Sequence, residues 1–135
     1  MFMLDTNIVI RIFRGPPPVL AERLLRHREQ ICISVITAFE LHVGAQKRRL
    51  AGSQREMERV QEFLRAIQVL PFDDFAAYQA AIVRAELEHA GSGIGAADTL
   101  IAGHAVATES ILVTNNMREF SRVERLSDFL QDWTA

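Results

Sequence analysis

The chain has 135 residues, of which 49% are hydrophobic and 24% are charged, and its formal net charge is −2. This size predicts one domain, residues 1–135, with enough apolar side chains for a core, and the charge excludes a broadly basic surface. The lone cysteine, Cys32, excludes an intrachain disulfide; because no apolar run could span a membrane and no signal peptide precedes the first predicted strand, we expect a cytosolic protein.

The first predicted element is a short buried strand over residues 2–4, followed by a helix from Asn7 to Arg14. Asp5 would stand at the carboxyl end of that strand, where open α/β sheets bind their ligands. Alternatively, Asp5 or Asn7 only caps the helix, because short polar side chains accept hydrogen bonds from the free N–H groups of a first turn.

A Gly-Pro-Pro-Pro stretch at residues 15–18 ends the first helix and precedes a second one. The expected apolar face of this second helix consists of Val19, Leu20, Leu24 and Leu25. Residues 31–33 then form a candidate second strand.

The next predicted helix follows Ser34 and carries Glu40 between two apolar neighbours, Phe39 and Leu41. A carboxylate beside an apolar stripe is costly unless another group pairs with it, which makes Glu40 a candidate functional residue. Thr37 and Glu40 also match a capping box, which would give Glu40 a purely structural role.

Residues 46–55 are polar and cationic, and contain Lys47, the only lysine of the chain. We expect a solvated turn here, slightly favoured over a nucleic-acid contact. Ser53 and Glu56 match a second capping box, which opens a helix with one apolar side formed by Met57, Val60, Phe63, Leu64 and Ile67.

Residues 68–72 predict a third strand, after which Asp73 or Asp74 caps a long helix reaching Ala90, with Gly91 at its C′ position. The side chains expected to point inward from this helix are Phe75, Tyr78, Ala81, Ile82 and Leu87. The spacing of the glycines at 91–95 matches the consensus of a dinucleotide-binding fingerprint. That fingerprint must follow a strand, however, and here a helix precedes the glycines. A turn between two helices is the better interpretation.

The helix predicted over residues 97–108 places Asp98 on the same stripe as Ile101, Ala102 and Ala105. An acid on the inward stripe of an apolar helix is unusual. A fourth strand over residues 111–113 ends abruptly in Thr114, Asn115 and Asn116. For the tail we expect an edge strand near residues 123–126 and a packed end formed by Phe129, Leu130 and Trp133.

Strands separated by helices predict a mostly parallel sheet with helices on both faces. In such a sheet Asp5 and Asn116 end two strands at one edge, and Glu40 and Asp98 begin helices near it. Acids gathered there would repel one another without a counter-ion, and an oxygen-only ligand set suits Mg²⁺ or Mn²⁺. The chain shows no histidine or cysteine set with zinc spacing. A carboxylate-held Mg²⁺ is typical of phosphate ester hydrolysis.

On these motifs the chain resembles PIN domains, and specifically VapC-type toxin ribonucleases. The matching segments, in order, are residues 3–7, 36–41, 94–102, 112–116 and 118–120. The resemblance implies an α/β fold with a PIN-like parallel sheet of four or five strands flanked by helices. It also implies a Mg²⁺-dependent endoribonuclease, with Mn²⁺ as a substitute, that cleaves structured RNA, often transfer RNA. Its implied partners are a second copy of the chain and a cognate VapB-like antitoxin.

By the family pattern, Asp5, Glu40 and Asp98 are the catalytic, metal-binding acids. Asn116 stands where the family often has a fourth acid, which puts a full two-metal site in doubt. The supporting residues would be Thr6, Asn7, Thr114 and Asn116, and the candidate RNA contacts are Arg48, Arg49 and Arg84.

Two other functions stay open at this point. A phosphatase could use Asp5 as its nucleophile, but such enzymes usually need a second aspartate two residues later, where Asn7 stands. Trapping of an acyl-phosphate would identify it. A binding module with a decayed site is the other alternative, and metal titration would distinguish it from an enzyme.

Overall fold

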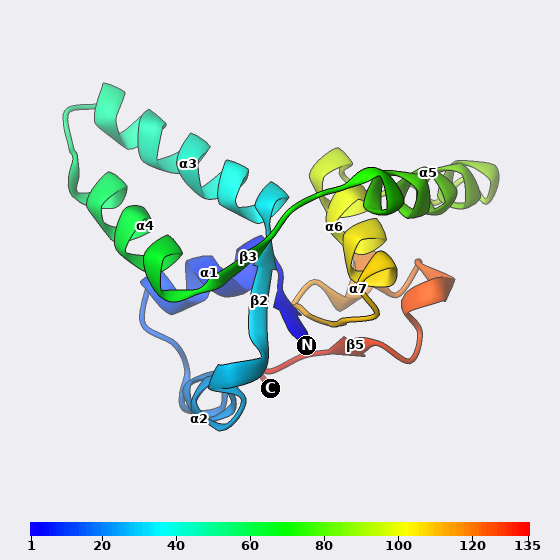
Figure 1. Ribbon diagram of the computed structural model, residues 1–135, viewed down its shortest axis with the longest axis horizontal. Coiled ribbons are helices and arrows are strands. Elements are labelled where there is room, and N and C mark those ends of the chain that lie inside the picture. Colours follow the sequence, from blue (N-terminus) through cyan, green and yellow to red (C-terminus); the bar gives the residue numbers. More distant parts are fainter.

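The computed structural model describes residues 1–135, and one parallel sheet of five strands organises it (Figure 1). The strands are β1 (Phe2–Leu4), β2 (Ile31–Ser34), β3 (Gln68–Leu70), β4 (Ile111–Val113) and β5 (Leu130–Gln131). Their order across the sheet is β3-β2-β1-β4-β5, so the first strand lies at the centre. The predicted α/β fold class is confirmed.

The register of the sheet brings several strand ends to one edge. Met3 of β1 pairs with Cys32 of β2 on one side and with Leu112 of β4 on the other. Because all the pairs are parallel, the residues that follow β1, β2 and β4 meet at the same carboxyl edge. Asp5 is fixed there by its own N–H, which donates to the carbonyl of Val113 at 2.9 Å.

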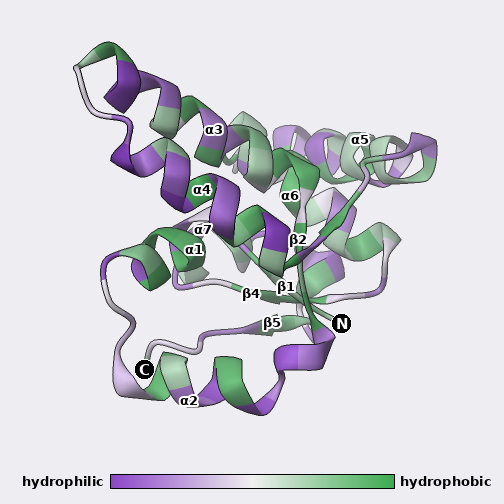
Figure 2. Ribbon diagram, turned by 60° about the vertical axis from the view of Figure 1, so that its left-hand side comes forward, coloured by the Kyte–Doolittle hydropathy of each residue, from purple (hydrophilic) through white to green (hydrophobic).

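Helices cover both faces of the sheet, because successive strand residues point in opposite directions. Met3, Cys32 and Leu112 face a core formed with α5 and α6, while their neighbours Leu4, Ile33 and Val113 face a second core. The second core lies under α1, α2, α3 and α4, and Figure 2 shows the strands in hydrophobic green between these layers. The helices are α1 (Thr6–Phe13), α2 (Pro18–Arg26), α3 (Val35–Leu50), α4 (Arg55–Ala66), α5 (Asp74–His89), α6 (Ala96–Ala107) and α7 (Met117–Phe120), with 3-10 turns at Arg28–Gln30 and Glu124–Leu126.

Helix α5 presents a different face to the core than its aromatic residues suggested. Phe75 and Tyr78, which were expected inward, are 55% and 63% exposed. The buried residues of this helix are Ala76, Ala80, Val83 and Leu87. Small side chains face inward because α5 packs closely against α6: a Cβ built on Gly103 of α6 would lie 2.2 Å from the Cα of Ala80.

Helix α3 continues through the basic residues that were expected to form a turn, and ends at Leu50. Lysine, arginine, glutamine and leucine favour helix, and cations in a last turn interact favourably with the helix dipole. The expected capping box at Ser53 is also wrong, since Gln54 occupies the N-cap of α4 and makes no side-chain capping bond.

The structure also differs from the sequence-based prediction in the buried face of α2 and in the position of the edge strand. On α2, Val19 and Leu25 are exposed and only Leu20 is buried. The segment 123–126 is not a strand: Val123 precedes a 3-10 turn that ends at Leu126, and both residues are buried. The edge strand is β5 instead. By contrast, Asp73 caps α5 as predicted, and Gly91 has the positive φ of a C′ glycine. None of the helices combines the length and the apolar character needed to cross a membrane.

Candidate active site

Asp5 is the centre of the carboxyl edge, and it both caps α1 and reaches the neighbouring strand. One carboxylate oxygen accepts the backbone N–H groups of Asn7 at 2.5 Å and Ile8 at 3.3 Å. The other oxygen accepts the hydroxyl of Thr114, the residue that follows β4. Asp5 is 2% exposed, and burial raises its pKa, opposed by these hydrogen bonds and assisted by the charge of Glu40. The capping explanation and the functional one are therefore compatible.

Glu40 faces the start of α1. The Thr6 hydroxyl donates to Glu40 Oε1 at 2.6 Å and lies 3.2 Å from the Thr37 hydroxyl oxygen. The capping-box explanation for Glu40 is wrong, because α3 begins earlier: Ser34 is its N-cap and accepts the N–H of Ile36 at 3.0 Å. Thr37 then lies inside the helix, and Glu40 one turn later points towards the site.

Asp98, in the first turn of α6, completes the group of predicted acids. Its pKa is raised to about 6, first by burial and then by the negative charges of Asp5, Glu119 and Glu40. This effect requires the four carboxylates to share one region, since Coulomb interactions between more distant charges are screened by solvent. The structure thus brings together the three acids singled out from the sequence.

Glu119 is a fourth acid that the sequence reasoning did not assign. It lies on α7, and its negative charge helps to raise the pKa of Asp98. The Asn116 side-chain amide donates to Glu119 Oε2 at 3.2 Å, and the Asn116 N–H donates to Thr114 Oγ1 at 2.9 Å. The available signal was a carboxylate three residues after Asn116, in a short helix that starts at the end of a strand.

The chemistry of this cluster fits a hard divalent cation. Its donors are carboxylate, hydroxyl and amide oxygens, the ligands that Mg²⁺ and Mn²⁺ prefer. As the side chains stand, no three acids, histidines or cysteines form a ready cage for an ion. Asp5 and Glu40 turn instead to neighbouring hydroxyl and amide donors. Burial is the first cause that raises the pKa of Asp5 and of Asp98, and the charge of neighbouring carboxylates adds to it; a bound cation would favour the ionised forms of both.

A buried link between α3 and α6 also escaped the sequence reasoning. His104 of α6 is 1% exposed, and its Nδ1 lies 2.7 Å from the Ser34 hydroxyl oxygen. Burial lowers its pKa, and the ring of Phe72 packs on it edge-on at 5.2 Å. Because Ser34 also caps α3, the link fixes the helix that carries Glu40 against the helix that carries Asp98.

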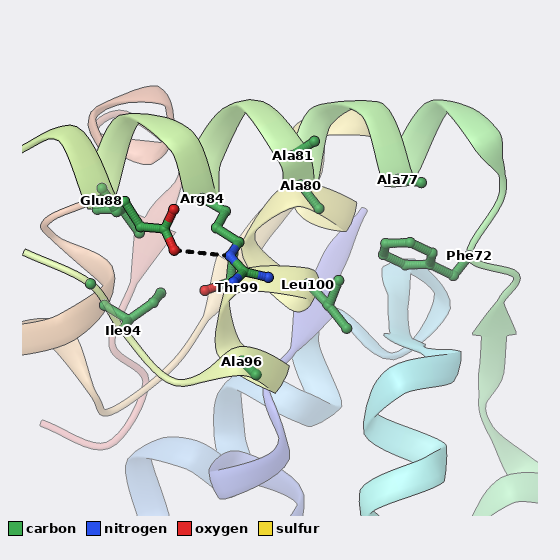
Figure 3. Close-up of a pocket in the computed structure, with 12 residues that line it drawn as sticks. Phe72, Ala77, Ala80, Ala81, Arg84, Glu88, Ile94, Ala96, Thr99 and Leu100 are labelled. Carbon is green, nitrogen blue, oxygen red and sulfur yellow. Dashed lines mark hydrogen bonds and ion pairs between the residues drawn. The ribbon is translucent and has the colours of Figure 1, made fainter.

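The predicted RNA-contacting arginines lie away from the acids. Arg48 and Arg49 belong to the last turn of α3, which projects from the molecule in Figure 1. Arg84 lines an open cavity of about 480 Å³ between α5 and α6, where its Nε donates to Glu88 at 3.1 Å (Figure 3). The α6 residues lining this cavity include Leu100, which is on the face opposite Asp98.

The role of Asn116 can be tested by calorimetric titration with Mg²⁺ and Mn²⁺. We expect Asn116→Asp to keep or raise the metal affinity, because it adds a carboxylate beside Glu119. Asp5→Asn should lose most of the affinity although asparagine still caps a helix, because the buried charge disappears. Asn115→Asp is the matched control, since Asn115 is exposed and should change little. Equal losses for Asn116→Asp and Asp5→Asn would contradict this assignment.

Comparison with known proteins gives consistent matches over nearly the whole chain. The family model for the PIN domain matches residues 2–126. A protein named tRNA(fMet)-specific endonuclease VapC from Shigella flexneri is 40% identical over 133 residues, which is 98% of each chain. Ribonuclease VapC2 of Haemophilus influenzae is 37% identical over 122 residues, covering 90% of this chain and 91% of that protein.

Solved structures agree with the sequence matches. A DNA-bound VapBC complex from Salmonella typhimurium contains a chain with a TM-score of 0.88 and 37% identity, covering 98% of this chain and 97% of that one. VapBC2 from Rickettsia felis, bound to a DNA fragment from its promoter, has a TM-score of 0.87 and 32% identity, with 98% of each chain covered.

Proposed function

The chain belongs to the PIN-domain family, among the VapC ribonucleases, and from that premise we propose that it is a Mg²⁺-dependent endoribonuclease, the toxin of a VapBC-type pair. The observation that carries the proposal is the convergence of Asp5, Glu40, Asp98 and Glu119 at the carboxyl edge of the sheet. A relative named for tRNA(fMet) makes that RNA the first substrate to test.

In the proposed site, Asp5, Glu40 and Asp98 hold the divalent ion, with Glu119 in the place of a fourth acid. When bound, such an ion lowers the pKa of water and stabilises negative charge on phosphate oxygens. Thr114 and the first N–H groups of α1 hold the Asp5 carboxylate in a fixed orientation, and Thr6 does the same for Glu40. Asn116 keeps Glu119 directed at the cluster.

The environment of Asp5 also bears on the phosphatase alternative. Both of its carboxylate oxygens accept hydrogen bonds, which lowers their nucleophilicity. No second aspartate follows two residues later, and Asn7 stands there with its side chain exposed. Hydrolysis by water is therefore the better account of this site, and the intact set of four acids does not suggest a decayed one.

We propose a VapB-like antitoxin as the protein partner, because the related solved structures are VapBC complexes. A homodimer remains a prediction. An enzyme that cleaves tRNA would meet its substrate in the cytosol.

Metal dependence and product chemistry test the function. Incubation with tRNA(fMet) and Mg²⁺ should give cleavage that excess chelator abolishes and that Mg²⁺ or Mn²⁺ restores. The products should carry a 5′-phosphate and a 3′-hydroxyl, because water and not the 2′-hydroxyl is the proposed nucleophile. His104 is buried against Ser34 and is not available as a base for the 2′-hydroxyl.

The matched controls are elongator tRNA(Met) as the substrate and Asp5→Asn as the enzyme. Sequencing of the cleaved ends identifies the position and the chemistry of the cut. Undiminished cleavage in chelator would falsify the metal-dependent mechanism, and a 2′,3′-cyclic phosphate product would exclude attack by water.

A further inference from the structure

Helix α1 leads directly away from the acids and exposes one polar stripe. Its residues Ile8 and Val9 are fully buried, whereas Asn7, Arg11 and Arg14 are exposed at the i, i+4 and i+7 positions of one face. The stripe begins at Asn7, whose N–H binds the Asp5 carboxylate. At 1.5 Å per residue, Arg11 follows about 6 Å and Arg14 about 10 Å farther along the helix.

The arginines of this stripe are free of intramolecular partners. The ion pairs of the chain involve other arginines, namely Arg26, Arg59, Arg84 and Arg125. Arg118 is also exposed and unpaired, and it directly precedes Glu119 in α7. Because β1 and β4 are neighbours, the start of α1 and the start of α7 lie on adjacent parts of the same edge.

A ribonuclease with this site needs local positive charge. Four carboxylates at the cleavage point repel the phosphates of RNA, and a net charge of −2 offers no general attraction. Arg11 lies about 6 Å along α1 from Asn7, and Arg118 is the neighbour of Glu119 in α7. Both distances are shorter than the Debye length, which is roughly 8 Å at physiological ionic strength. Arginine also binds phosphate through a rigid fork of donors.

We propose that Asn7 and Arg11 on α1, Arg14 at the C-cap of α1 and Arg118 on α7 bind the RNA phosphate backbone next to the cleavage site. This proposal rests on the proposed ribonuclease function and names the surface that positions its substrate. The stripe carries no large exposed apolar side chain, which favours a phosphate backbone over a protein partner. Arg49 and Arg84 are less suited, because the side chain of Arg49 already binds Gln46 and that of Arg84 already binds Glu88.

The experiment compares Arg11→Gln, Arg14→Gln and Arg118→Gln with two controls of equal charge change. Arg28→Gln and Arg65→Gln remove exposed, unpaired arginines that lie just before β2 and β3, at the opposite edge of the sheet. In cleavage of tRNA(fMet), each stripe variant should raise KM by about three- to tenfold with kcat unchanged, and the controls should change neither. Thermal melts check that every variant folds.

Binding is measured separately, without metal and on an Asp98→Asn background that cannot cleave. The anisotropy of fluorescein-labelled tRNA(fMet) at several salt concentrations gives the slope of log affinity against log salt. Each lost phosphate contact should reduce this slope by about 0.8. If the arginines only interact with the helix dipole at the end of α1, their substitution should change the melting temperature slightly and leave KM and the salt slope unchanged.

Two results would overturn the proposal. One is that the stripe variants match Arg28→Gln and Arg65→Gln in both KM and salt slope. The other is that they keep their RNA affinity but lose affinity for the purified antitoxin, which would assign the stripe to the protein partner. If the unchanged protein cleaves no RNA, the proposed function fails, and the binding measurement still decides on this surface.

Discussion

Asp98→Asn is expected to raise the melting temperature of the metal-free protein by about 3 °C at pH 7. In that state Asp98 is one of four neighbouring acids, and burial and their charges raise its pKa from 3.8 to about 6. A rise of this size corresponds to at most about 3 kcal/mol. Because Asp98 is only partly buried, solvent screening leaves about 1 kcal/mol to be relieved. Cleavage should be lost in the variant under all conditions.

The pH dependence of this gain follows from the direction of the pKa shift. The folded protein holds the Asp98 proton more tightly than the unfolded chain does, so this group lowers the stability as the pH rises from 3.8 towards 6. Above that range the cost is constant. The advantage of Asp98→Asn should therefore be full at pH 7 and nearly absent near pH 4, where the carboxyl is already protonated in the folded protein.

Adding a divalent ion should reverse the order of the two melting temperatures. A ligand that binds only the folded state at a hundred times its Kd adds about 2.7 kcal/mol to the stability, and only the intact cluster gains it. Asp74→Asn is the matched control, since Asp74 also lies in the first turn of a helix but is exposed. It should lose a few tenths of a kcal/mol whether or not Mg²⁺ is present.

The result that counts against a shared site is equally clear. If Asp98→Asn melts lower than the unchanged protein in chelator, Asp98 is an ordinary residue of a helix N-terminus. The same conclusion would follow if Mg²⁺ did not change which of the two proteins, Asp98→Asn or the unchanged one, melts at the higher temperature.

Gly103→Ala is the second change with a large expected effect, and it acts on the scaffold. The added Cβ would lie 2.2 Å from the Cα of Ala80 and 2.5 Å from its backbone nitrogen. These are backbone atoms, so α5 and α6 must move apart, and overpacking of this kind costs about 1–3 kcal/mol or more. The gain in helix propensity from glycine to alanine, about 1 kcal/mol, offsets part of the cost. With a steric cost at the upper end of this range, the net loss is about 1–2 kcal/mol, and we expect the melting temperature to fall by about 3–6 °C.

Gly44→Ala provides the matched control inside another helix. A Cβ on Gly44 of α3 meets no atom within 4 Å, so only the propensity changes and the melting temperature should rise by about 3 °C. Differential scanning calorimetry of both variants measures the contrast. A Gly103→Ala protein as stable as Gly44→Ala would mean that α5 and α6 are not in close contact at Ala80.

The features of this protein that depend on short-range chemistry can be predicted from its residues in order along the chain. Apolar runs ended by polar residues identified β1 and β4, and therefore Asp5 and Thr114 at one edge of the sheet. Asp98 was recognisable because a carboxylate on the inward stripe of an apolar helix needs a compensating partner. Asp73 and Gly91 marked the two ends of α5, since capping involves only a few neighbouring residues.

Which apolar side chains are buried and which acids lie together depends on contacts between segments that are distant in the chain. Phe75 and Tyr78 lie outside because α5 turns its Ala80 face to α6, where the close approach leaves room only for a small side chain. Gly103, which permits this approach, is 23 residues from Ala80 in the chain. Glu119 joins the site because β4 lies beside β1, a pairing between segments more than a hundred residues apart. His104 and Ser34 meet across 70 residues of sequence. Local patterns carry no information on such contacts, because their energies depend on groups that only the complete fold brings together.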